Sequence, residues 1–343
     1  MYNEAAWKSL DLLFKKIHDA GLVAAPIMLW TLMKTDPGQV YSEDQCIEIA
    51  KKQLERWDAP DVVWLLGGDG DYREPAIDAR WKRIGRAVFA GKADTLSTLH
   101  PCGATWVGDS FSKEPWYGIA TIQSGHGSIQ SALKFLVDEE YAAAWKRMEK
   151  PFLNLEPNYE DARSYKVRVH LTDYHVRRAS YWSLMVAPPA GITYGINGIW
   201  IWSNTQNEIA ENHDATWVGQ PWRTQLDTPG SRSMAVLRAV YEKLPWIDLR
   251  PAPERLVRQP GTSDYEFWQS ASISLKKDCL IAYAPHGGTV ALDTRDLAEG
   301  LRVYRVDPIT GEWLQIGALK ERTPSVLFDL PSEKEKDWLL VIV

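Results

Sequence analysis

The chain has 343 residues and a formal net charge of −6, and 45% of its residues are hydrophobic and 24% charged. This length corresponds to about two domains, and the composition is typical of a globular protein, not a disordered or fibrous one. It contains no basic tract and no apolar run approaching the roughly 20 residues that cross a bilayer, so we expect neither nucleic acid nor a membrane as a partner. Three widely spaced cysteines without a CxxC pair argue against a disulfide framework.

One count departs from an ordinary composition. There are 17 Trp and 14 Tyr residues but only 7 Phe residues. Trp and Tyr combine a flat apolar face with a polar edge, which suits the C–H-rich face of a sugar ring. The excess favours a carbohydrate ligand, and the alternative is a Trp-rich core.

The first 250 residues alternate helical patterns with nearly continuous apolar runs. Helices are predicted over 5–19, 42–57, 75–90, 128–148, 167–185 and 234–244. Strands are predicted over 22–30, 61–66, 94–100, 118–123, 151–155 and 191–202. Apolar runs of this kind are typical of parallel strands buried on both faces. The alternation predicts βαβ units, with polar residues at the carboxyl ends of the strands, where barrel enzymes place their sites.

The pattern changes near residue 251. A proline-punctuated stretch is followed by short strands and turns, expected at 279–283, 289–292, 301–306, 313–316, 325–328 and 338–343. We therefore predict two domains, a TIM-like α/β barrel over 1–250 and a small antiparallel β-sandwich over 251–343.

The strand count sets a condition on the barrel. Six strand–helix units are predicted, whereas a closed (β/α)8 barrel has eight strands. Because the chain opens on a helix, the expectation is a barrel that lacks its first two strands. The opening segment is not a signal peptide; the chain as given would be cytoplasmic, unless a missing front segment carried a signal.

Two carboxylates have positions suited to catalysis. Asp69 and Glu156 each stand where a predicted buried strand ends, and in a barrel both would face the same mouth. A pair of carboxylates across a glycosidic bond is the basic equipment of most glycosidases. Asp71 and Glu160 are local alternatives for the same roles, and an acid after a strand can also be ordinary loop polarity.

Two histidines also follow predicted strands. His100 and His126 could hydrogen-bond sugar hydroxyls or orient a carboxylate, or simply satisfy loop carbonyls. A zinc site built from them and an acid lacks any recognised ligand spacing, so no metal and no cofactor are expected.

Three other motifs are weak. The segment 67–70 is glycine-rich, but no Lys-Ser/Thr follows it as in a phosphate loop. Asp69-Gly-Asp71 begins like a calcium loop without the later ligands. Ser128 lacks the following glycine of a nucleophile elbow.

Five motifs in order carry a family resemblance. They are Trp64-Leu-Leu-Gly-Gly-Asp69, Leu99-His-Pro101, Trp116 with Ile122-Gln-Ser-Gly-His126, Asn154-Leu-Glu-Pro-Asn-Tyr-Glu160, and Tyr194-Gly with Gly198-Ile-Trp200. Together they resemble the apiosidase-like glycoside hydrolases, glycoside hydrolase family 140. The tail from Leu244-Pro-Trp246 onward resembles the β-domain labelled collagen-binding that accompanies them.

The resemblance implies a retaining hydrolase of plant cell-wall polysaccharide side chains, including apiose units. Asp69 matches the acid/base at the end of barrel strand four, and Glu156 matches the nucleophile at the end of strand seven. The family's first two strands, with an early Asp-Thr-Ala-Trp-type motif, have no counterpart here.

The leading hypothesis is thus a glycoside hydrolase with a carbohydrate substrate. His100, Gln123, His126 and Tyr159 are expected to contact the sugar, and Trp30, Trp202 and Trp116 are candidates for stacking on it. The first alternative is a non-catalytic carbohydrate-binding protein built on a truncated barrel. A second alternative is a collagen-type adhesion module over 251–343, although a structural brace for the barrel is the preferred role of that segment. The oligomeric state is not fixed by the sequence.

Overall fold

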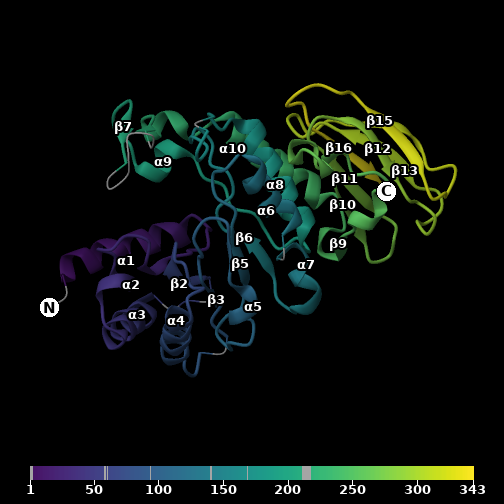
Figure 1. Ribbon diagram of the computed structural model, residues 1–343. Coiled ribbons are helices and arrows are strands. Elements are labelled where there is room, and N and C mark those ends of the chain that lie inside the picture. Colours follow the sequence, from purple (N-terminus) through teal and green to yellow (C-terminus); the bar gives the residue numbers. More distant parts are fainter. Residues whose placement is uncertain are drawn as a thin grey trace. The chain divides into compact units, whose positions relative to one another are not determined.

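The computed structural model describes residues 3–57, 59, 61–92, 94–139, 141–167, 169–210 and 218–343 (Figure 1). The chain divides into two compact units, Met1–Gln123 and Ser124–Val343. Each unit is described by itself.

The first unit alternates helices with short parallel strands. Its elements are α1 (Glu4–Asp19), β1 (Ile27–Trp30), α2 (Pro37–Val40), α3 (Glu43–Trp57), β2 (Trp64–Gly68), α4 (Pro75–Val88), β3 (Ser97–Thr98), β4 (Thr105–Trp106), α5 (Gly108–Phe111) and β5 (Ala120–Gln123). Strands β1, β2 and β3 pair in parallel in that order, and β4 pairs antiparallel with β5. The predicted α/β alternation of this region is confirmed. The strands are shorter than the apolar runs from which they were predicted.

Local sequence explains why these elements begin and pack where they do. Helix α3 starts with a capping box, in which Ser42 Oγ accepts from the Gln45 N–H and Gln45 Oε1 accepts from the Ser42 N–H. All five residues of β2 are buried, as expected for a strand covered on both faces. Trp116 is also buried, at 4% exposure, and it packs against Phe89, Phe111 and Tyr117. It serves the interior of this unit and offers no exposed face for stacking on a sugar.

The second unit begins with helices and continues into the C-terminal strands. Its helices are α6 (Gln130–Asp138), α7 (Tyr141–Ala144), α8 (Asp173–Val186), α9 (Asn197–Ile201) and α10 (Pro229–Glu242), with 3₁₀ turns at Trp145–Arg147, Trp222–Gln225, Trp246–Asp248, Pro253–Arg255, Pro260–Thr262 and Tyr265–Phe267. Strand β6 (Phe152–Asn154) precedes α8, and parallel bridges join Phe152 to Pro189 and Glu160 to Ile196. Strands β7 (Glu208–Ile209) and β8 (Val218–Gly219) form an antiparallel pair.

The C-terminal strands are antiparallel, as predicted. They are β9 (Leu249–Pro251), β10 (Ser270–Ser274), β11 (Leu280–Ala284), β12 (Gly288–Leu292), β13 (Arg302–Val306), β14 (Trp313–Ala318), β15 (Val326–Leu330) and β16 (Trp338–Ile342). One sheet has the order β14-β13-β16-β11-β10-β9, and β12 pairs separately with β15. Residues from both sheets, among them Leu280, Leu340, Val290 and Leu292, form one buried apolar cluster. Strands β9 and β10 are additions to the predicted set.

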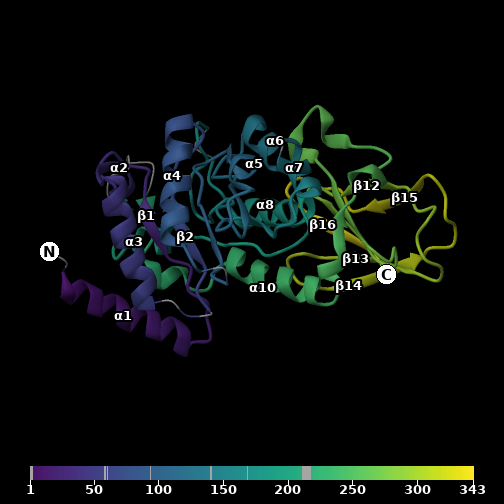
Figure 2. The ribbon, with the colours of Figure 1, turned by 90° about the horizontal axis from the view of Figure 1, so that it is seen from below.

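Helix α8 joins this sheet to the rest of the second unit. It lies beside α10 and α6 and contacts β10 and β9 (Figures 1 and 2), and twelve of its fourteen residues are buried. Arg177 on α8 donates to the fully buried Asp337 through Nη2 at 3.0 Å and Nε at 3.1 Å. The Tyr283 hydroxyl donates to Asp337 Oδ2, the oxygen that also accepts from Arg177 Nε, at 3.1 Å. A buried ion pair therefore connects α8 with the C-terminal sheet.

Two sequence predictions were wrong in this unit. The expected strand over 191–202 contains helix α9 in its second half, and Trp202 is the left-handed residue that caps this helix. The helix expected from residue 167 begins at Asp173, after a capping box in which His175 Nδ1 accepts from the Thr172 N–H. In the first part of the 191–202 run, the Thr193 hydroxyl donates to the carbonyls of Asn154 and Leu155, and Ile196 forms a parallel bridge with Glu160.

Candidate functional site

In the second unit, Glu156 and His126 lie in contact. Glu156 follows β6, and His126 lies in the segment that leads from residue 124 to α6. His126 Nε2 lies 2.8 Å from Glu156 Oε1. The His126 side chain is 2% exposed and that of Glu156 14% exposed, so solvent reaches the carboxylate but hardly reaches the imidazole.

The protonation of the imidazole follows from its second partner. The backbone N–H of Tyr159 points at His126 Nδ1 from 3.2 Å, and a backbone N–H can only donate. Nδ1 is therefore the acceptor. In the neutral ring Nε2 carries the proton and donates a hydrogen bond to Glu156 Oε1. The rings of Tyr159 and Tyr165 pack on the imidazole, with centroids 4.3 and 5.5 Å away. The orientation of His126 is thereby fixed.

Asn154 holds the backbone around this pair. Its Oδ1 accepts from the Ser124 N–H at 3.1 Å and from the Glu156 N–H at 3.3 Å, and its Nδ2 donates to the Ser124 and Ser183 hydroxyls. The Gly125 N–H donates to the Glu156 carbonyl at 2.9 Å. No motif assigned a role to Asn154. The available signal was its position at the end of the strand that directly precedes Glu156.

Glu160, the local alternative to Glu156, has a structural role. It is 7% exposed and accepts from the hydroxyls of Tyr194 and Thr228, both at 2.6 Å, and from the Gly230 N–H at 2.9 Å. Gly230 lies in the first turn of α10, where a carboxylate offsets unpaired N–H groups and the positive end of the helix dipole. Glu160 therefore stabilises the N-terminus of α10.

In the first unit, Asp69 stands in a tight turn immediately after β2. Its φ is +53°, a left-handed value that Asp tolerates better than most residues. Thr31 and the Tyr72 ring lie so close to Gly70 that a Cβ there would overlap both. The turn therefore needs glycine beside Asp69 and presents the acid at the carboxyl end of the strand, half-buried. Asp71, by contrast, is exposed and paired with Arg73 at 2.6 Å.

The other expected residues of this unit lie at the same strand ends. His100 is 6% exposed, and its Nδ1 lies 3.1 Å from the Pro101 carbonyl, so Nδ1 carries a proton. Gln123 ends β5, is 3% exposed, and its Oε1 has no partner among the described residues. Trp30 ends β1, is 43% exposed, and backs onto Gly68.

Trp202 is in the second unit. It is 60% exposed and stacks on Trp222, with ring centroids 4.9 Å apart and an angle of 15° between planes. The guanidinium of Arg223 lies over Trp222 at 4.3 Å. One face of Trp202 therefore packs on a second indole, and its exposed surface remains a candidate for stacking on a sugar.

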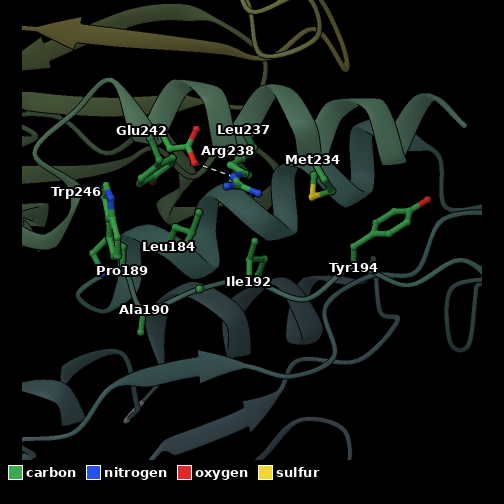
Figure 3. Close-up of a pocket in the computed structure, with 12 residues that line it drawn as sticks. Leu184, Pro189, Ala190, Ile192, Tyr194, Met234, Leu237, Arg238, Glu242 and Trp246 are labelled. Atoms are coloured by element: carbon green, nitrogen blue, oxygen red, sulfur yellow. Dashed lines mark hydrogen bonds and ion pairs between the residues drawn. The ribbon is translucent and has the colours of Figure 1, made fainter. Parts of the chain in front are cut away.

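An apolar cavity of about 400 Å³ lies elsewhere in the second unit (Figure 3). Side chains of α8, α10 and the segment 189–194 line it, including Leu184, Ile192, Met234 and Leu237, together with Trp246 of the turn that follows α10. The Arg238–Glu242 ion pair lies at its edge. None of the expected site residues lines this cavity, and its walls offer few polar groups for sugar hydroxyls.

Among the described residues, no three His, Cys, Asp or Glu side chains gather in an arrangement that could hold a metal ion. Within the same residues, no helix combines the length and the apolar character of a membrane span.

Solved structures share the fold of this chain. A glycoside hydrolase family 5 protein from Bacteroides vulgatus aligns with a TM-score of 0.83 at 20% identity, covering 98% of this chain and 73% of its own. A second glycoside hydrolase aligns with the same TM-score at 23% identity, covering 98% and 76%. A family 30 endoxylanase from Clostridium papyrosolvens aligns with a TM-score of 0.53 at 11% identity, covering 99% and 84%. These neighbours have TIM-barrel-like folds.

Family profiles match most of the chain. The apiosidase-like catalytic domain matches residues 1–248, and the "Putative collagen-binding domain of a collagenase" matches residues 265–343. No curated protein sequence matches the chain. Because the first match covers well over half of the chain, the protein belongs to the apiosidase-like family of catalytic domains and is a glycoside hydrolase.

Proposed function

We propose that the protein is a retaining glycosidase of plant cell-wall-type polysaccharide side chains, with Glu156 as nucleophile and Asp69 as acid/base. Its catalytic domain would be a TIM-like barrel over 1–250, followed by a β-sandwich over 251–343. In that barrel Asp69 ends the fourth strand and Glu156 the seventh. The observation that carries the proposal is the His126–Glu156 hydrogen bond.

That bond favours a nucleophile at Glu156. With Nδ1 occupied by the Tyr159 N–H, the neutral imidazole offers Glu156 a donor and no acceptor. A donor stabilises the ionised carboxylate over the protonated acid, and a nucleophile must be ionised to attack the anomeric carbon. The proton for the leaving oxygen must then come from another group, and Asp69 is the half-buried acid at a strand end for that role.

Each unit carries polar and aromatic side chains that suit a sugar. Gln123 has an acceptor without a partner in the described residues, which a sugar hydroxyl could satisfy. His100 would add a further contact to the ring hydroxyls, as would Tyr159, whose ring packs on His126. Trp30 and Trp202 expose large indole faces, and such faces stack on the apolar side of a pyranose or furanose.

Turnover and product stereochemistry test the proposal. Assays would use aryl glycosides with good and poor leaving groups and a mixture of pectic oligosaccharides. We expect Glu156→Gln to abolish turnover of every substrate while sugar binding remains. Asp69→Asn should spare the first step, formation of the glycosyl-enzyme, for glycosides with good leaving groups, which need little protonation, and should slow the second step, in which Asp69 activates water. The first-formed sugar should retain its anomeric configuration by NMR.

Matched variants and outcomes complete this test. Asp71→Asn changes the neighbouring exposed acid and should leave activity near wild type. An inverted first product would contradict the nucleophile role of Glu156. Sugar binding without turnover in the wild type would instead support the non-catalytic carbohydrate-binding protein.

A further inference from the structure

A second, smaller cavity lies in the C-terminal part of the second unit. Its volume is about 210 Å³, below the roughly 300–1,000 Å³ of pockets for drug-sized ligands. It is bounded by the turns at 260–262 and 265–267 and by the loop between β11 and β12. Its lining residues include Arg258, Phe267, Gln269, His286 and Thr289. The size admits one ring and not a chain of rings.

One wall is an aromatic face held in place. Phe267 is 45% exposed, and its ring lies 4.8 Å from the His286 ring at 50°. His286 is itself fixed, since its Nδ1 accepts from the Glu335 N–H at 2.8 Å and its Nε2 lies 3.3 Å from the Tyr174 hydroxyl. Phe267 therefore presents a positioned apolar face to the cavity.

The polar wall is also preorganised. Gln259 clamps the backbone of Gln269, accepting from its N–H at 2.9 Å and donating to its carbonyl at 2.7 Å. The Gln269 amide is 3% exposed; its Nε2 donates to the Thr289 carbonyl, and its Oε1 has no partner among the described residues. An unpaired buried acceptor is costly, and a ligand hydroxyl would satisfy it.

The charged side chain among the residues that line the cavity is that of Arg258. Arg258 is exposed and, within the described residues, takes part in no ion pair or hydrogen bond. No carboxylate lines the cavity; Asp329, next to it, accepts from the Thr289 hydroxyl. Burial, together with the positive charges of Arg178 and Lys334 and against the opposing Asp264, lowers the pKa of His286 to about 4. The imidazole is therefore neutral near pH 7, and Arg258 is the charged group available to a ligand.

We propose that this cavity binds a single sugar-acid ring, with its apolar face on Phe267, a hydroxyl on Gln269 and its carboxylate on Arg258. An aromatic face beside convergent polar groups is typical of sugar recognition, and a guanidinium pairs with a carboxylate through two parallel hydrogen bonds. The site makes no use of Asp69 or Glu156. It would attach the protein to an acidic polysaccharide independently of catalysis.

Affinity electrophoresis of the full chain tests this proposal. The probe is polygalacturonate cast into the gel, with neutral galactan in a parallel gel. We expect the wild type to be retarded by polygalacturonate and not by galactan. Arg258→Gln and Phe267→Ala should each raise the apparent dissociation constant at least about tenfold, since each removes a main contact.

Two control variants change similar residues away from the cavity. Arg302→Gln removes an exposed arginine on β13, and Leu314→Ala truncates an apolar side chain that is also 45% exposed. Both should migrate like the wild type. Because Arg258 is exposed, Arg258→Gln should fold even if Phe267→Ala does not, and thermal unfolding checks this.

Three outcomes would overturn the proposal. The first is retardation that neither Arg258→Gln nor Phe267→Ala changes. The second is equal retardation in galactan that Arg258→Gln leaves intact, because the ligand would then need no carboxylate. The third is binding of a (Gly-Pro-Hyp) repeat peptide that both variants abolish while polygalacturonate is not bound, which would assign the cavity to a protein ligand.

Discussion

At the scale of single residues, the His126–Glu156 bond assigns different chemistry to side chains of similar appearance. Glu156 accepts from His126 and remains accessible to solvent, whereas the Glu160 carboxylate is buried and accepts from Tyr194, Thr228 and Gly230. The sequence named Glu156 because it follows a predicted buried strand, and Glu160 as its local alternative. It could not separate them, since the partners of Glu160 lie 34 to 70 residues further along the chain.

His126 is predicted to act as a positioning residue for Glu156. His126→Ala removes the donated hydrogen bond, and a hydrogen bond to a charged group contributes about 1.5–3 kcal/mol, so kcat/KM should fall roughly 10- to 150-fold. The acidic limb of the pH–rate profile should move to higher pH, because a carboxylate that loses a donor is protonated more readily. His126→Gln, which can place an N–H near Nε2, should recover part of the activity.

A matched histidine provides the control. His170 pairs with Asp161 at 2.6 Å, but its side chain is 58% exposed. His170→Ala should leave both the rate and the pH profile unchanged. If His126→Ala lowers activity without moving the acidic limb, His126 supports the fold and does not position Glu156.

At the scale of elements, tertiary contacts decide where local patterns are ambiguous. A short apolar run suits a buried strand or a buried helix equally well, and Gly198-Ile-Trp-Ile-Trp202 is such a run. Helix α9 forms there because Asn197 Nδ2 donates to the Val218 carbonyl and Gln225 Oε1 accepts from the Gly198 N–H. These partners lie more than twenty residues away. In contrast, α1, α3 and α4 were predicted closely, because their caps and apolar faces are local.

The capping box of α8 leads to a pH prediction. Burial lowers the pKa of His175 to about 3, whereas an unfolded histidine titrates near 6.5. Between these values the unfolded chain binds the extra proton, so His175 lowers the stability of the fold as the pH falls below about 6.5, by up to about 1.4 kcal/mol per pH unit. Glutamine is the usual partner in a capping box, so His175→Gln should keep the cap and remove the titration.

Urea unfolding at pH 7.5 and pH 5.0 measures this effect. From pH 7.5 to pH 5.0, the free energy of unfolding of the wild type should fall by up to about 2 kcal/mol more than that of His175→Gln. The comparison isolates His175, since His286 titrates in both proteins. His170→Gln, at an exposed position, should follow the wild-type curve. Parallel losses in the wild type and in His175→Gln would contradict the assignment.

At the scale of the whole molecule, the sequence predicted the parts better than their connections. The change in sequence pattern near residue 251 predicted antiparallel strands, and the C-terminal sheet confirms them. The ion pair between Arg177 and Asp337 could not be foreseen, because its members are 160 residues apart and neither belongs to a recognisable motif. With α8 almost entirely buried, the C-terminal sheet has the position of a brace for this unit.

A double-mutant cycle on this pair tests the brace. Asp337→Leu leaves the buried Arg177 without its main partner, and Arg177→Met leaves the buried Asp337 unpaired, so each single change should lower the free energy of unfolding by about 3–5 kcal/mol. The double variant should lose much less than the sum, since it removes both charges together. Arg232→Met, at an exposed pair with Asp227, should change the free energy by less than about 1 kcal/mol.

Denaturant unfolding, followed by tryptophan fluorescence and by circular dichroism, should give coincident transitions in the wild type, because α8 and the C-terminal sheet unfold together. If the losses of the two single variants simply add, Arg177 and Asp337 do not stabilise the fold as a pair, and the brace must rest on apolar packing around α8 alone.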